Sequence, residues 1–133
     1  MAEGAGSWRP SDEELEVVLE VIFAVCLPDG ELSEPELSRL RDRIVQLENG
    51  SLRPDRIDGL MLRAAMQLEK EPREARLAHA RRVLDEKARR TALALAIEVA
   101  SADGLDPRER AAAGAVADAL GILPGELDAM LAA

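Results

Sequence analysis

The chain carries the same pattern twice, as VIFAVCLPDGELSEPELSRL at residues 21–40 and as LAIEVASADGLDPRERAAAGAV at residues 95–116. Each copy is an apolar segment with helical spacing, an Asp-Gly pair and a capping box that opens a second amphipathic segment. The Asp-Gly pairs begin at Asp29 and Asp103, and the second copy has one residue fewer before its capping box. The repeat predicts two pseudo-symmetric helix–turn–helix hairpins packed around one core, since a solenoid needs more than two copies.

Helix boundaries along the rest of the chain follow the same signals. Capping boxes, in which the first side chain and a Glu three residues later each accept a backbone N–H bond, occur at residues 11–14, 33–36 and 106–109. Helices are expected to start near residues 11, 33, 54, 72, 85, 106 and 124, and no segment alternates with a period of two. The sequence therefore predicts an all-α fold of about seven helices, with residues 1–10 as a flexible start and residues 11–133 as one domain.

Composition excludes several functional classes. Aromatic residues make up 2% of the 133 residues, which argues against the stacking platforms of single-stranded nucleic acid binders. A net charge of −9 disfavours nucleic acid as a general partner. Cys26 is the sole cysteine and lies in an apolar run, so it is expected to pack in the core, with no intrachain disulfide or cysteine-based zinc site. Apolar runs are too short for a membrane span, and we expect a cytoplasmic protein without direct membrane insertion.

The two copies together resemble the tellurite-resistance TerB-like family, which is related to a domain of membrane-anchored DnaJ-like co-chaperones. The resemblance rests on an apolar helix ending in Asp-Gly, a capping Ser or Asp three or four residues later and a Glu three further on, found twice. The closing LGILPGELDAML at residues 120–131 is also similar to the family's usual ending. The likeness covers roughly residues 12–132, and residues 50–84 contribute little to it.

The resemblance implies an all-helical domain associated with stress response or tellurite resistance, for which no catalytic mechanism is established. It further implies that the acidic loops hold divalent cations. Carried over by position, the candidate metal ligands are Asp29, Glu31 and Glu36 in the first loop and Asp103, Asp106 and Glu109 in the second.

The residues themselves leave two interpretations of these loops open. Residues 29–36 match the second half of a calcium-binding EF-hand loop, but Val25 and Leu27 stand where its opening carboxylates belong. Neither loop can form a complete calcium site alone, so the two would have to converge or water would have to fill most positions. Alternatively, the carboxylates are only helix caps and Asx-type turns, and the glycines permit tight turns.

Other single residues carry weaker signals. Glu98 stands inside an apolar run, and it is either exposed on an amphipathic helix or part of an acidic cluster near Asp103. His79 has no partner at metal-ligand or catalytic spacing. The sequence contains neither a Gly-x-Ser-x-Gly turn nor a glycine-rich phosphate loop, so a small hydrolase built on converged carboxylates is the weakest hypothesis and we expect no enzyme.

Charge is distributed unevenly along the chain. Residues 11–36 contain nine acids and no bases, whereas residues 73–90 contain seven bases and three acids. This asymmetry indicates two solvated faces, head-to-tail association of copies, or recognition of an acidic partner. The arginines that could serve such a partner are Arg73, Arg76, Arg81, Arg82, Arg89 and Arg90.

Two functional hypotheses follow for the whole chain. The first is a non-enzymatic interaction domain with protein partners, a homo-oligomer among them, and a divalent cation at its acidic loops. The alternative is a metal-independent adaptor, with an apolar or arginine-rich groove for its partner.

Overall fold

The computed structural model describes residues 10–26, 32–47 and 54–132, and all regular secondary structure within these ranges is helical. This confirms the predicted all-α fold of about seven helices. The elements are α1 (Asp12–Cys26), α2 (Glu34–Leu47), α3 (Pro54–Lys70), α4 (Arg73–Val83), α5 (Glu86–Ala100), a short 3₁₀ turn η2 (Ser101–Asp103), α6 (Pro107–Leu120) and α7 (Pro124–Ala132).

The helices begin where capping side chains are placed in the sequence. At the start of α1, the backbone N–H of Ser11 donates to Glu14 Oε1 at 2.8 Å, and that of Glu14 donates to Ser11 Oγ at 3.1 Å. Asp85 caps α5 by accepting from the backbone N–H of Ala88 at 2.8 Å. Gly121 ends α6 in the left-handed conformation, with a φ of 77°. These local contacts explain why the boundaries follow from the sequence.

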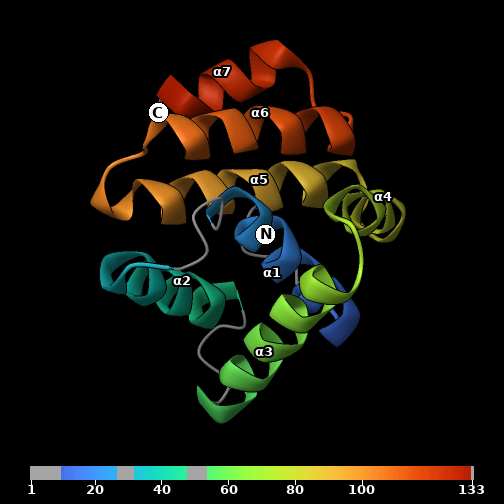
Figure 1. The fold of residues 1–133 in the computed structure, drawn as a ribbon, viewed down its shortest axis with the longest axis vertical. Helices are drawn as coiled ribbons and strands as arrows, with labels where there is room; N and C mark the ends of the chain where they lie inside the picture. Colours follow the sequence, from blue (N-terminus) through green and yellow to red (C-terminus); the bar gives the residue numbers. More distant parts are fainter. Residues whose placement is uncertain (1–9, 27–31, 48–53, 133) are drawn as a thin grey trace, which may run out of the picture.

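Helix α1 is the centre of the molecule (Figure 1). It packs against α3, α4, α5 and α6, and every residue from Val17 to Cys26 is buried. Helix α5 supplies the largest facing surface, while α7 packs on α6 and α5. Because α1 is apolar around most of its circumference, it can be covered on several sides at once. None of the helices described here is long and apolar enough to cross a membrane.

The two repeat copies have different surroundings. In the second copy, α6 packs against α5, so this hairpin closes on itself. In the first copy, α2 packs against α5 and η2, while α1 is buried in the core. Similar local sequence therefore gives two helix pairs with different packing, and the predicted pseudo-symmetric arrangement stays a prediction.

Candidate functional site

Three of the six predicted loop carboxylates have described side chains. They are Glu36 at the start of α2 and Asp106 and Glu109 at the start of α6. Asp29 and Glu31 lie outside the described residues, and only the backbone of Asp103, in η2, is described.

Both predicted capping boxes beside the loops are present. The N–H of Ser33 donates to Glu36 Oε1 at 2.9 Å, and the N–H of Glu36 donates to Ser33 Oγ at 3.2 Å. In the second box, the N–H of Asp106 donates to Glu109 Oε1 at 3.1 Å, and that of Glu109 donates to Asp106 Oδ1 at 2.8 Å. Each glutamate thus has one carboxylate oxygen committed to a helix cap.

The two capping glutamates meet in the folded chain. Glu36 and Glu109 are 4% and 6% exposed, and a hydrogen bond joins their side chains. Burial raises the pKa of Glu109 to about 7, and the hydrogen bond and negative charge of Glu36 add to this rise. The backbone N–H of Asp106 opposes it by stabilising the charged carboxylate. Two helix starts that are 73 positions apart in the sequence therefore share one buried carboxyl pair, which we call the Glu36–Glu109 pair.

The pair does not by itself complete a metal site. Among side chains that the structure describes, no group of three or more His, Cys, Asp or Glu residues could hold a metal ion. Hard cations such as Ca²⁺ take roughly six or more oxygen ligands. A cation at this position would therefore need further oxygens from water or from loop residues beyond the described ranges.

Glu98 is partly exposed on α5, in line with one of the two interpretations, and it forms two ion pairs that the sequence did not indicate. Its carboxylate bridges to Arg39 at 3.2 Å and to Arg43 at 3.4 Å, and 35% of its side chain is exposed. It therefore ties α5 to α2 through two arginines.

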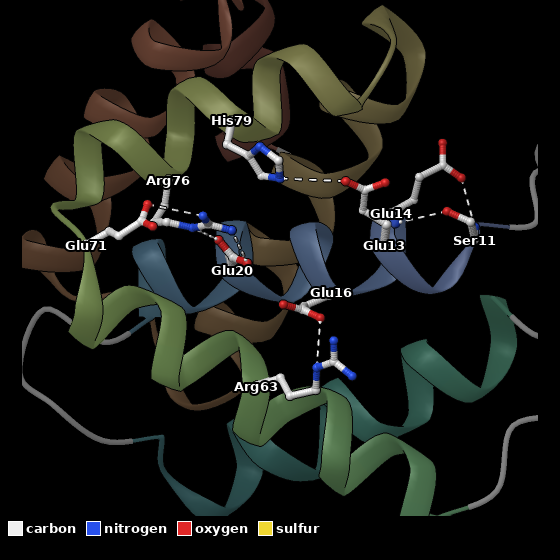
Figure 2. Close-up of polar contacts among 9 residues, drawn as sticks. All are labelled: Ser11, Glu13, Glu14, Glu16, Glu20, Arg63, Glu71, Arg76 and His79. Atoms are coloured by element: carbon white, nitrogen blue, oxygen red, sulfur yellow. Dashed lines mark hydrogen bonds and ion pairs between the residues drawn. The ribbon is translucent and has the colours of Figure 1, made fainter.

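A second candidate site, which sequence reasoning missed, is an open groove of about 690 Å³ between α1, α3 and α4. Figure 2 shows its centre, with Glu16 and Glu20 of α1 between Arg63 of α3 and Arg76 of α4. We call it the α1–α3–α4 groove. Its lining residues are Asp12, Glu13, Glu16, Val17, Glu20, Asp55, Arg56, Gly59, Leu60, Arg63, Gln67, Arg76 and His79.

The base of the groove is a buried ion pair. Glu20, which is 2% exposed, accepts from Arg76 Nε at 2.7 Å and from Arg76 Nη2 at 3.0 Å. Arg76 Nη1 also donates to Glu71 at 3.2 Å. Its hydrogen bonds to Glu20 are the main reason that the pKa of Arg76 is raised. Two fixed parallel hydrogen bonds make this the best-defined polar contact between α1 and α4.

The rim of the groove is more open. Arg63 Nε lies 3.2 Å from Glu16 Oε1, and the Arg63 side chain is 71% exposed. Asp12 pairs with Arg56, whose guanidinium holds the pKa of Asp12 below its usual range. His79 Nε2 lies 3.9 Å from a carboxylate oxygen of Glu13. The sequence around His79 could not indicate this neighbour, because Glu13 belongs to α1 and His79 to α4.

Several arginines of the basic segment have partners within the chain. Arg76 belongs to the groove, Arg89 Nε donates to the carbonyl of Leu84 at 2.9 Å, and Arg90 pairs with Glu86 and Glu126. Arg81 lies over Gly121, where a Cβ atom would be 2.9 Å from its Nη2. The predicted set of six partner-binding arginines is therefore not a single free surface. Arg73, Arg81 and Arg82 are exposed.

Cys26 is fully buried, and its Sγ lies 3.7 Å from the carbonyl oxygen of Ala96. This confirms the expected packing role of the thiol between α1 and α5.

Comparison with known proteins gives no further identification. No family model matches the chain, no curated protein is significantly similar to it, and no solved structure matches its fold at significance.

Proposed function

We propose that this chain is a non-enzymatic, TerB-like interaction domain that binds a divalent cation between its two acidic loops. The convergence of Glu36 and Glu109 is the observation that supports this proposal best. Neither loop contains enough ligands alone, so a cation site requires the two loops to meet. The contact between the buried capping glutamates that follow the two loops supports such a meeting.

The chemistry of the pair suits a hard cation. Carboxylate oxygens are preferred ligands of Ca²⁺, Mg²⁺ and Mn²⁺, and two facing carboxylates repel each other unless a positive charge or a proton lies between them. We propose that Asp29, Glu31, Asp103 and Asp106 supply additional oxygens, directly or through water. Tellurite resistance and stress response come only from the family resemblance and belong to the same proposal.

A metal-independent adaptor is the second candidate, and one observation favours it. Each glutamate already caps a helix, and a hydrogen bond from protonated Glu109 to Glu36 would link the starts of α2 and α6 without any metal. In that case, the carboxyl pair is a structural contact, and partners bind elsewhere on the surface.

Calorimetric titration of chelator-treated protein with Ca²⁺, Mg²⁺, Mn²⁺ and Zn²⁺ separates the two candidates. The cation hypothesis expects saturable binding that is lost in Asp29→Asn, Asp103→Asn and Glu109→Gln variants. Glu14→Gln is the matched control, since Glu14 forms the same capping box at α1 with Ser11. Absence of binding below about millimolar metal, or equal binding by all variants, would leave the adaptor as the function.

A further inference from the structure

The central helix reaches the surface only at its first turns. Val17 to Cys26 is buried, and so is Leu15. The side chains of α1 that retain solvent contact are Asp12, Glu13, Glu14 and Glu16, and all four are acidic. Apart from Glu14, they line the α1–α3–α4 groove. What α1 offers to a ligand is therefore a row of carboxylates.

Charge in the groove is unbalanced toward the negative. Five carboxylates line it against three guanidinium groups. One of the three, Arg76, is held by both Glu20 and Glu71. Arg63 is 71% exposed in its pair with Glu16, and exposed pairs of this kind contribute little to stability. A cationic side chain entering the groove can compete with Arg63 for Glu16 at little cost.

The spacing of these acids matches a helical ligand. Among the solvent-accessible acids, Asp12 and Glu16 are four residues apart, which is about 6 Å along the axis of α1. A second helix lying along the groove presents side chains at the same interval when it carries Lys or Arg at every fourth position.

Helix α3 carries two exposed apolar side chains that do not line the groove but follow Gly59 on the same helical stripe. Leu62 and Met66 are 62% and 47% exposed, and helical spacing places them on the same stripe as Gly59, which lines the groove. A Cβ atom at Gly59 would meet no atom within 4 Å, so open space surrounds this point of α3. The groove thus has a surplus of carboxylates, and helical spacing places two exposed apolar side chains next to its α3 edge.

We propose that the α1–α3–α4 groove, with the adjoining stripe of Leu62 and Met66, docks a basic amphipathic helix of a partner protein. Cations of the helix face Glu13 and Glu16, and its apolar side chains cover Leu62 and Met66, as in other helix-in-groove complexes. A small polyamine would match the carboxylates but would leave the apolar stripe uncovered. The proposal names the partner class for the interaction role proposed above, and it does not depend on the cation site at Glu36 and Glu109.

The test measures binding of a fluorescent model helix to the full chain. The probe is a synthetic helical peptide with Lys at every fourth position and Leu on the adjacent stripe. Its control replaces each Lys by Glu, and spermine serves as a small polycation. Binding is followed by fluorescence anisotropy at low and high salt in the presence of chelator, with spermine tested by displacement of the peptide.

Two groove variants and two matched controls locate the bound peptide. Glu13→Gln with Glu16→Gln removes charge from the groove, and Leu62→Gln with Met66→Gln removes the apolar stripe. Glu74→Gln removes an exposed acid that helical spacing places on the opposite face of α4 from Arg76, and Leu123→Gln changes a leucine that is 66% exposed before α7. Circular dichroism melts verify that all four variants fold.

The proposal expects saturable, salt-sensitive binding of the Lys peptide that weakens about three- to tenfold in each groove variant and stays unchanged in both controls. It is overturned if the Glu peptide binds equally, if the control variants weaken binding as much as the groove variants, or if no peptide binds up to about 1 mM. Spermine that displaces the peptide at equal affinity, with no effect of Leu62→Gln and Met66→Gln, would overturn the helical partner. Each of these outcomes leaves the metal titration at the loops unaffected, so the two proposals fail separately.

Discussion

Replacing Glu109 by Gln should remove a pH dependence of stability from this protein. In the folded chain Glu109 shares a hydrogen bond with Glu36 and has a pKa of about 7. A glutamine amide donates an N–H to Glu36, as the protonated carboxyl group does, and its oxygen can still accept from the N–H of Asp106. The variant therefore imitates the protonated protein at every pH.

The size of the effect follows from the shift in pKa. A change from the ordinary value of 4.5 to about 7 corresponds to about 3 kcal/mol, because each pKa unit is worth about 1.36 kcal/mol. The folded chain holds this proton to higher pH than the unfolded chain does. The stabilising contribution of Glu109 is therefore complete below about pH 4.5 and is lost as the pH rises through about 7. Between about pH 5 and pH 8, the wild-type free energy of unfolding should fall by roughly 2–3 kcal/mol relative to that of the variant.

Urea denaturation in the presence of chelator, repeated across this pH range, measures the difference directly. Comparison with the variant at each pH cancels the contributions of the other titrating groups. Glu14→Gln, which changes the capping box of α1, should run parallel to the wild type. A constant difference between wild type and Glu109→Gln at all pH values would refute a shared proton in the Glu36–Glu109 pair.

Three further substitutions test a buried ion pair and two glycine positions by urea denaturation. Glu20→Gln should cost about 3 kcal/mol because it leaves Arg76 without its buried counterion. The double variant Glu20→Leu with Arg76→Leu should cost much less, and equal costs of the two variants would contradict this reasoning. Gly121→Ala should cost about 1–2 kcal/mol, since φ is 77° and a guanidinium of α4 occupies the space of the Cβ, while Gly125→Ala should be nearly neutral. Gly59→Ala should instead stabilise α3 by about 0.5–1 kcal/mol, because its Cβ enters open space, and a loss of stability would indicate crowding.

The helix boundaries could be predicted because their determinants are local. A capping box involves side chains and N–H groups three residues apart, so Ser33 and Asp106 mark their helices whatever the rest of the chain does. The packing role of Cys26 was equally accessible, since it lies within a long apolar run.

The groove could not be predicted because its contacts join distant segments. Glu20 pairs with Arg76, which lies 56 positions later, and nothing in the arginine-rich segment singles out that arginine as the one facing inward. A usable signal was present on α1, where Asp12, Glu16 and Glu20 form a polar stripe that runs from the acidic first turn into the apolar part of the helix. Such a stripe indicates either an open face or a set of ion pairs, and here it forms both.

The loop carboxylates could be predicted only in part. The sequence identified Glu36 and Glu109 and required their loops to converge for a cation site, but only the packing of α2 against α5 and η2 brings one half of the pair into place. Local pattern therefore gave the candidates, and tertiary contacts decided which of them meet.

The Glu36–Glu109 pair also sets a physical condition that any function of these loops must satisfy. Because these two carboxyl groups are only 4% and 6% exposed, the folded chain is destabilised when both are charged without a compensating positive charge. The charged neighbours that act on Glu109 are Glu36 and Asp106, which are both acidic, so the described neighbours provide no such charge. A proton meets the condition and makes stability depend on pH, whereas a divalent cation meets it with both carboxylates charged. Saturation with a bound cation should therefore abolish the difference in pH dependence between the wild type and Glu109→Gln, and a difference that persists at every metal concentration favours the adaptor.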